Sequence, residues 1–196
     1  MELKELEAYA LEHNIPIMQE EGLDFLLQYI KEHQVKHILE IGAAIGYSAI
    51  RMALLSPDIT VVTVERDPER YQEAIKNIKA FGLEKQITIY HMDAFDLKLD
   101  ETFDFIFIDA AKAQYIKFFK KFKQNLATNG TILSDNLNFH GLAKEPDKIE
   151  SKNLRALVRK INNYTDYLKT NEEFTTTFYN LGDGIAVSRR RREFLD

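Results

Sequence analysis

The chain has 196 residues, of which 45% are apolar and 29% are charged, a composition typical of one globular domain with a substantial core. It contains no cysteine, which excludes disulfides, thiolate nucleophiles and cysteine-ligated zinc. The net charge of -5 disfavours a dedicated nucleic-acid binder, and the chain shows neither a membrane-spanning apolar run nor a basic leader, so a cytoplasmic protein without a membrane partner is expected.

Charge is distributed unevenly along the chain. Residues 1 to 24 hold seven acidic residues and one lysine, whereas residues 110 to 134 hold five lysines and no acid. Four consecutive arginines follow near the end, at 189 to 192. These cations are either solvated helix faces with a basic tail or a local basic face on an acidic molecule.

Helical and apolar extended segments alternate along the chain. Two helices are expected before residue 34, and no repeat or linker divides the rest, which predicts one domain over residues 1 to 196. Strands are expected at residues 37 to 41, 60 to 65, 87 to 92, 103 to 109, 130 to 135, 175 to 181 and 184 to 189, with helices near 48 to 55, 68 to 81, 113 to 126 and 149 to 168.

The pattern of these segments predicts an α/β fold. Central runs that are almost wholly apolar are typical of parallel strands covered by helices on both faces. Gly182 and Asp183 separate the last two runs, which is a hairpin signal and places an antiparallel strand near the end of the sheet. In doubly wound sheets, ligands bind beyond the carboxyl ends of the strands, so the functional residues are sought there.

The first strand runs through Glu40 into a turn with the sequence GAAIG, from Gly42 to Gly46. The spacing differs from the dinucleotide fingerprint, which disfavours a nicotinamide dehydrogenase, and no Gly-Lys-Ser/Thr follows to form a P-loop. A bare backbone that is not built around phosphate suits a nucleoside with a short zwitterionic tail. The alternative is a tight turn that needs glycine for its own geometry.

Acidic residues end the next two strands. Glu65 lies nineteen residues after Gly46, where an acid can accept hydrogen bonds from ribose hydroxyls. Asp93 and Ala94 follow the third strand, where an adenine edge would lie. Each acid alone could be a solvated strand end, but a glycine turn and two acids on three successive strands favour an adenosine site.

The fourth and fifth strands end in oxygen-bearing side chains, Asp109 on one and Asp135 with Asn136 on the other. Because neighbouring strands lie about 4.8 Å apart, these groups can converge on a hard cation such as Mg²⁺. Lys112 follows one turn after Asp109, and a partly desolvated lysine near a cation can act as a general base. The alternatives are ordinary loop caps and an exposed helix lysine.

The segments EIGAAIGYSAIRMA, TVERDP, IDAAK and SDN, in this order, resemble the metal-dependent S-adenosylmethionine O-methyltransferases of the catechol and caffeoyl-CoA type. The resemblance implies a Rossmann-like class I methyltransferase with a seven-stranded sheet, a homodimer, and N-terminal helices at 1 to 34 that help form the substrate and dimer face. It also implies Lys112 and Asp109 as catalytic residues. The implied cofactor-binding residues are Ile17, Met18, Glu40, Gly42, Gly46, Ser48, Glu65, Asp93, Ala94 and Asp109, and the implied Mg²⁺ ligands are Asp109, Asp135 and Asn136.

Within that family, LEAYA, IPIM, DAAKAQY, DNLNFHGL and LGDGIAVSRR resemble the bacterial tRNA 5-hydroxyuridine methyltransferases most. This implies tRNA as the partner, methylated at the wobble base. The expected phosphate contacts are Lys117, Lys120, Lys121, Lys123, Arg155, Arg159, Arg189 and Arg190. The alternatives are a small catechol-like acceptor and, from another class, a non-catalytic nucleotide-binding module.

Overall fold

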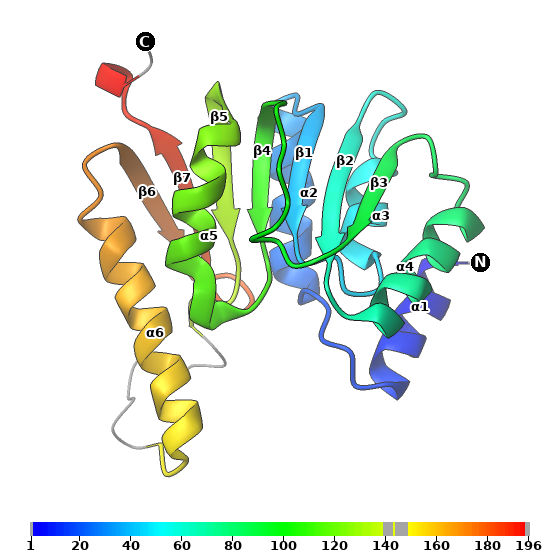
Figure 1. Cartoon of the computed structure of the whole chain (residues 1–196), viewed down its shortest axis with the longest axis horizontal. Helices are drawn as coiled ribbons and strands as arrows, with labels where there is room; N and C mark the ends of the chain where they lie inside the picture. The colour runs from blue at the N-terminus through cyan, green and yellow to red at the C-terminus, as the bar shows by residue number, and fades with distance from the viewer. Residues whose placement is uncertain (1, 139–142, 144–148, 195–196) are drawn as a thin grey trace.

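The computed structural model describes residues 2 to 138, 143 and 149 to 194 (Figure 1). It contains a seven-stranded sheet in the order β3-β2-β1-β4-β5-β7-β6. The strands are β1 (His37–Ile41), β2 (Thr60–Glu65), β3 (Ile87–His91), β4 (Phe103–Ile108), β5 (Leu126–Ser134), β6 (Phe174–Tyr179) and β7 (Ile185–Arg190). The helices are α1 (Leu3–Glu12), α2 (Glu20–Glu32), α3 (Tyr47–Ala53), α4 (Pro68–Ala80), α5 (Tyr115–Phe122) and α6 (Lys152–Lys169).

The sheet confirms the predicted α/β class with a mostly parallel sheet. Strands β1 to β5 pair in parallel, and β7 lies antiparallel between β5 and β6. Strands β1 to β6 therefore end at one edge of the sheet, called here the pocket edge, whereas β7 ends at the opposite edge. In Figure 1 the pocket edge faces down and the C-terminus lies at the top.

Two apolar cores lie on the two faces of the sheet. One core combines side chains of α1, α2, α3 and α4 with residues such as Ile38 and Phe105. The other combines the aromatic stripe of α5 and buried residues of α6 with alternate strand residues such as Leu39 and Ile106. Because successive strand residues point to opposite faces, apolar runs in the central strands serve both cores at once.

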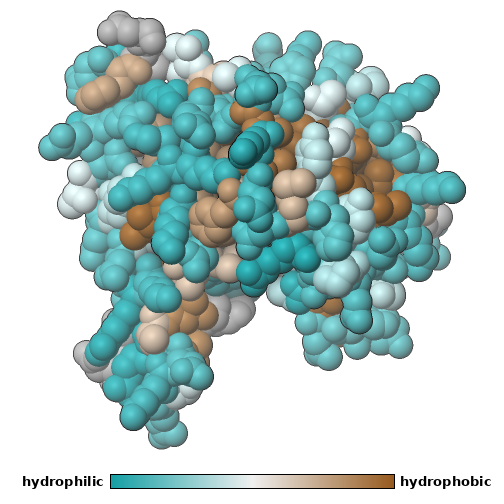
Figure 2. Space-filling view, in the orientation of Figure 1, coloured by the Kyte–Doolittle hydropathy of each residue, from teal (hydrophilic) through white to brown (hydrophobic). Residues whose placement is uncertain are grey.

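The second face is less completely covered than the first. Residues 92 to 102, which connect β3 to β4, form no helix, and only Leu97 and Ala94 of this connection are buried in the core. Val62, Tyr90 and Leu99 are only partly buried there, and Figure 2 shows apolar residues on the surface in this region. None of the helices in the described part of the chain is long and apolar enough to span a membrane.

Several helices and strands begin or end at other residues than predicted. Helix α6 begins at Lys152, because the Ser151 side chain caps it by accepting a hydrogen bond from the Leu154 N–H. The segment predicted as one helix at 113 to 126 is a short α5 flanked by 3₁₀ turns at Lys112–Gln114 and Lys123–Asn125. Strand β5 begins at Leu126, earlier than predicted, and pairs there with Phe103 across a register shift.

Candidate active site

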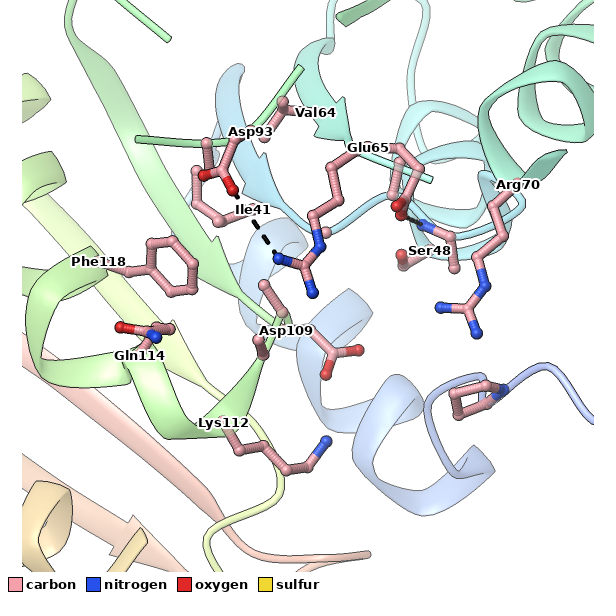
Figure 3. A pocket seen from close by; sticks show the side chains of 18 of the residues that line it. Ile41, Ser48, Val64, Glu65, Arg70, Asp93, Asp109, Lys112, Gln114 and Phe118 are labelled. Atoms are coloured by element: carbon pink, nitrogen blue, oxygen red, sulfur yellow. Dashed lines mark hydrogen bonds and ion pairs between the residues drawn. The ribbon is translucent and has the colours of Figure 1, made fainter. Parts of the chain in front are cut away.

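A pocket of about 620 Å³ opens at the pocket edge, between the ends of β1, β2, β3 and β4 (Figure 3). Of the predicted cofactor-binding residues, the pocket lining contains Ile17, Met18, Gly42, Ser48, Glu65, Asp93, Ala94 and Asp109. Glu40 and Gly46 are not among the lining residues. The structure thus brings most of these predicted residues together around one cavity.

The two glycines in the turn after β1 are required by the conformation and packing of the backbone itself. Gly42 has φ +103, and a Cβ atom placed there would lie 2.4 Å from the Asp109 carbonyl oxygen. Gly46 has φ +83 at the start of α3, and an added Cβ would contact Ala74 of α4. Chain packing and left-handed backbone are sufficient to require glycine at both positions, as the alternative of a tight turn predicts, and their role in cofactor binding stays a prediction.

Glu65 is held in place by backbone donors. Its two carboxylate oxygens accept hydrogen bonds from the Ala44 N–H at 2.9 Å and the Asp67 N–H at 2.8 Å. A carboxylate has about four lone-pair sites, so both oxygens keep capacity for ribose hydroxyls. Glu65 is therefore held in the pocket lining at the end of β2, and its role as ribose acceptor stays a prediction.

Asp93 and Ala94, at the end of the third strand, line the part of the pocket where an adenine is predicted to bind. Asp93 accepts a hydrogen bond from the Phe95 N–H and forms an ion pair with Arg66 at 3.8 Å, marked by a dashed line in Figure 3. Phe118 of α5 lines the pocket and stacks on Phe95, with ring centroids 4.7 Å apart. Phe118, one of the α5 aromatics that pack in the core, thus also supplies part of one pocket wall.

Sequence reasoning missed several lining residues. Pro16, Tyr47, Arg66, Arg70 and Gln114 all contribute to the wall. Arg66 follows Glu65 directly and Arg70 lies in the first turn of α4, so their position next to a predicted ribose acid was the available signal.

Tyr47 connects the pocket to the N-terminal helix. Its hydroxyl donates to Glu7 of α1 at 2.5 Å and accepts from Arg51 at 2.8 Å, and Arg51 also lies 3.8 Å from Glu7. Burial, together with the Glu7 hydrogen bond, raises the pKa of Tyr47 to about 12, so the phenol stays protonated. This Glu7–Tyr47–Arg51 cluster fixes α1, and the Pro16 to Met18 segment that follows it forms a pocket wall.

Asp109, Asp135 and Asn136 converge after β4 and β5. The Asn136 side-chain amide donates to Asp109 at 3.1 Å and to Asp135 at 2.9 Å. Asn136 has φ +66, a left-handed conformation that asparagine tolerates better than most residues. The predicted trio is therefore assembled, with the amide bridging the two carboxyl groups.

The electrostatics of this cluster suit a cation. Burial, together with the nearby Asp109, raises the pKa of Asp135 to about 7. Burial likewise raises the pKa of Asp109, which Lys112 and the Asn136 hydrogen bond oppose. Asp183, in the β6–β7 hairpin, adds a third carboxylate that acts on both, and sequence reasoning missed it because it lies far away in the chain.

The donor set fits a hard dication with one rearrangement. Two buried carboxylates repel each other, and a cation between them would relieve that repulsion. The Asn136 side-chain amide would have to rotate so that its oxygen, in place of its nitrogen, points toward the cation between the two carboxylates. Within the described residues, no group of three or more His, Cys, Asp or Glu side chains is placed to hold a metal ion, so the predicted site depends on two carboxylates and one amide.

Lys112 lines the pocket beside Asp109, as Figure 3 shows for both side chains. Its charge acts to lower the Asp109 pKa, so the two groups interact electrostatically. This arrangement places a basic side chain next to the candidate cation ligands, where the predicted general base has to lie.

The predicted phosphate contacts separate into two groups. Lys117 lines the pocket, and Arg155 and Arg159 lie in the first half of α6, below the sheet in Figure 1. By contrast, Arg189 and Arg190 end β7 at the opposite edge.

Several of these cations have intramolecular partners. Lys121 donates to the Phe95 carbonyl, Arg155 donates to the Ile149 carbonyl, and the Lys120 ammonium lies 5.5 Å from the centroid of the Tyr167 ring. At the opposite edge, Lys123 and Arg190 both pair with Glu173. Residues 139 to 142, the end of the DNLNFHGL motif, lie outside the described residues.

A sequence profile of the O-methyltransferase family matches residues 1–191. The chain belongs to this O-methyltransferase family.

The family includes relatives with named substrates. The chain is 30% identical to a caffeoyl-CoA O-methyltransferase of Stellaria longipes, over 86% of this chain and 72% of the relative. It is 28% identical to a flavonoid 3',5'-methyltransferase of Vitis vinifera, over 90% and 78%. A solved Staphylococcus aureus structure, named as a candidate caffeoyl-CoA O-methyltransferase, superposes with a TM-score of 0.93 at 36% identity, covering 97% of this chain and 93% of that one.

Family membership and fold confirm the predicted enzyme class, an S-adenosylmethionine-dependent O-methyltransferase of the caffeoyl-CoA type. The metal, the tRNA partner, the homodimer and the roles of individual residues stay predictions. In this chain, Glu65, Asp93 and Asp109 line the pocket at the strand ends.

Proposed function

We propose that this O-methyltransferase transfers a methyl group from S-adenosylmethionine to the 5-hydroxyl of 5-hydroxyuridine at the tRNA wobble position, giving 5-methoxyuridine, with Mg²⁺ or another hard dication as cofactor. The observation that carries the proposal is that Asp109 and Asn136 line the same pocket as Glu65 and Asp93, while Asp135 accepts a hydrogen bond from Asn136. One cavity then holds a candidate cation site beside a candidate adenosine site.

The acceptor chemistry follows from the candidate cation site. In 5-hydroxyuracil the C5 hydroxyl and the C4 carbonyl are vicinal oxygens, as are the two hydroxyls of a catechol, and either pair can chelate a dication. When bound, the cation would lower the pKa of a coordinated hydroxyl. Asp109, Asp135 and Asn136 would hold it, and the remaining chemistry belongs to the protein's own side chains.

Side chains of this chain then position the reactants. Glu65 would accept from the ribose, and the wall of Pro16, Ile17 and Met18 would exclude water from the other side of the pocket. Lys112, in its neutral amine form, would take the proton that leaves the acceptor hydroxyl as the methyl group arrives on its oxygen. The products are the methyl ether, S-adenosylhomocysteine and a proton.

Charge at the pocket edge supports a polyanionic acceptor. Arg66, Arg70, Lys112 and Lys117 all line the pocket, against three acidic residues. A cationic rim attracts RNA phosphates and makes binding salt-dependent. Arg155 and Arg159, on the first half of α6, extend the basic residues at this edge.

A small catechol-like acceptor is the second candidate. It is favoured by the caffeoyl-CoA and flavonoid relatives, whose names describe small phenolic acceptors. The vicinal-oxygen chemistry is the same for both acceptors, so only the surroundings of the pocket distinguish them.

The deciding experiment supplies both acceptors. The enzyme, S-adenosylmethionine and Mg²⁺ are incubated with an anticodon stem-loop carrying 5-hydroxyuridine at the wobble position, with the unmodified uridine stem-loop as control, or with catechol. Mass spectrometry of nucleosides should show 5-methoxyuridine only with the hydroxylated stem-loop. Methylation of catechol alone would favour the second candidate, and cofactor binding without transfer to either acceptor would indicate a non-catalytic module.

A further inference from the structure

Two buried tyrosines hold the end of β5, where the predicted cation ligands begin. Tyr115, the first residue of α5, donates its hydroxyl to the backbone carbonyl of Asp135 at 3.1 Å. Tyr164 of α6 shares a hydrogen bond of 2.6 Å with the Ser134 hydroxyl, one residue earlier in the chain. The two rings pack edge to face, with centroids 5.3 Å apart. Neither tyrosine is among the residues that line the pocket, so the proposed reaction assigns no role to either hydroxyl.

The Tyr115 hydroxyl acts as a permanent donor. Burial raises the pKa of Tyr115 well above its ordinary value, and the charges of Asp109 and Asp135 add to this, so the phenol keeps its proton. A phenylalanine would fill the same space in the core without a polar atom. The buried hydroxyl is therefore explained by the group that it bonds, the Asp135 carbonyl.

That carbonyl belongs to the peptide bond between two of the predicted cation ligands, Asp135 and Asn136. Asn136 has φ +66, in the left-handed region that costs free energy for a residue with a side chain. Rotation about this angle changes the direction of the 135–136 peptide relative to the Asn136 side chain. A donor fixed to the Asp135 carbonyl therefore stabilises the orientation in which the Asn136 amide lies 2.9 Å from the Asp135 carboxylate.

The same hydrogen bond joins two segments that each carry part of the site. Tyr115 follows the 3₁₀ turn that begins at Lys112, whereas Asp135 and Asn136 follow β5. The Asn136 amide also links the two segments by donating to Asp109 at 3.1 Å, but it gives up this bond when it rotates to present its oxygen to a cation. The Tyr115 hydrogen bond uses a backbone carbonyl, so it persists when the amide rotates.

We propose that Tyr115 is a positioning residue for the cation site, because its hydroxyl holds the 135–136 peptide in the orientation that presents Asp135 and Asn136 to one ion. The hydrogen bond organises the two ligands before the cation arrives, so it contributes to cation affinity and not to the methyl-transfer step itself. The inference rests on the proposed function for the identity of the ligand, a hard dication.

Cation binding by two matched variants tests this role. Tyr115→Phe and Tyr164→Phe each remove one buried hydroxyl that bonds the end of β5, but only Tyr115 bonds the 135–136 peptide. Mn²⁺ binding to the protein is measured by electron paramagnetic resonance. Tyr115→Phe should bind Mn²⁺ about tenfold more weakly, the effect of losing an outer-shell partner, and Tyr164→Phe should stay within about twofold of the wild type. The melting temperatures should fall by similar amounts, since each variant loses one buried hydrogen bond.

Kinetics give a second readout that a loss of stability alone does not change. The Mg²⁺ concentration for half-maximal methyl transfer should rise about tenfold in Tyr115→Phe and stay unchanged in Tyr164→Phe. At saturating Mg²⁺ the rate of Tyr115→Phe should return to within about threefold of the wild type, because the bound ion then orders its own ligands. The affinity for S-adenosylhomocysteine, measured by calorimetry, should be unchanged in both variants.

The outcomes separate the inference from the proposed function. Equal Mn²⁺ affinity in the wild type and Tyr115→Phe, or equal weakening in the two variants, overturns the role of Tyr115 while leaving metal-dependent methyl transfer intact. A folded wild type that binds no Mn²⁺ overturns the cation site of the proposed function, and the role of Tyr115 with it.

Discussion

The carboxyl groups at the two edges of the sheet have pKa values shifted in opposite directions. At the pocket edge, Asp109 and Asp135 lie close together, and burial raises the pKa of both. At the opposite edge, Glu173 is paired with Lys123 and Arg190, whose hydrogen bonds outweigh burial and hold its pKa below the ordinary value.

This contrast assigns different roles to the two edges. Carboxylates that are left uncompensated destabilise the protein and are found where a ligand is to supply the missing charge. A carboxylate that already has two cationic partners is saturated and joins structural elements. The pocket edge is therefore prepared for a ligand, and the opposite edge fastens the ends of α5, β6 and β7 together.

The strongest test of the contrast is Asp135→Asn at the pocket edge. Methyl transfer should fall by more than about 100-fold, because loss of a direct cation ligand exceeds the effect of removing an outer-shell partner. S-adenosylhomocysteine affinity should change by less than about threefold, measured by calorimetry. The melting temperature without divalent cations should rise, since a like-charge repulsion with Asp109 is removed.

The control for that variant is Asp58→Asn, which removes an exposed carboxylate paired with Lys36. It should leave activity unchanged. Full activity of Asp135→Asn, or of the wild type in excess chelator, contradicts a metal-dependent reaction.

The second prediction concerns the pH dependence of stability. The Glu40 pKa is raised from 4.5 to about 7, so the folded state binds more protons than the unfolded state between these values. Its contribution is complete below pH 4.5 and is lost as the pH rises to 7, a decrease of about 3 kcal/mol in the free energy of unfolding. Urea unfolding should show that Glu40→Gln lacks this decrease, whereas Glu84→Gln, at an exposed site, keeps it.

The third prediction concerns the ion pairs at the opposite edge. Glu173→Gln leaves Lys123 and Arg190 without their carboxylate partner, and the Glu173 side chain is only 26% exposed. The free energy of unfolding should fall by about 2 kcal/mol, between the values for surface and buried pairs. The neighbouring Glu172→Gln should have little effect, and methyl transfer per folded molecule should be unchanged in both variants.

The smallest effect compares cations at the two edges. Lys117→Gln, at the pocket, should weaken stem-loop binding about threefold at moderate salt and reduce the slope of log affinity against log salt by about one. Arg189→Gln, at the opposite edge, should change neither quantity. A larger loss with Arg189→Gln would place the RNA on the wrong side of the sheet for this proposal.

Local pattern was sufficient to predict most of the fold. The apolar runs at β1, β2 and β4 and the hairpin at Gly182 gave the sheet and its antiparallel strand, because side-chain periodicity is set within each segment. It also predicted that Asp109, Asp135 and Asn136 would meet, since parallel strands end at one edge.

Long-range consequences were harder to predict. Asp183 joins the acidic cluster only through the path of the β6–β7 hairpin, and the reason for Gly42 depends on a carbonyl 67 residues away. The direction of β7 was itself predictable from the hairpin. An antiparallel β7 must end at the opposite edge, so the sequence already implied that Arg189 and Arg190 lie far from the pocket.

The contacts that hold α1 to the core affect how long a product stays bound in the pocket. Residues 16 to 18 form a wall of the pocket, yet α1 itself has just two buried side chains, Leu6 and Ala10. Its other attachments are the partly buried Leu3 and Tyr9 and the Glu7–Tyr47–Arg51 cluster. Detachment of one short helix requires far less free energy than opening the sheet. The dwell time of S-adenosylhomocysteine, and with it the turnover rate when release is slow, is thus tunable from the N-terminus without altering any group that touches the methyl acceptor.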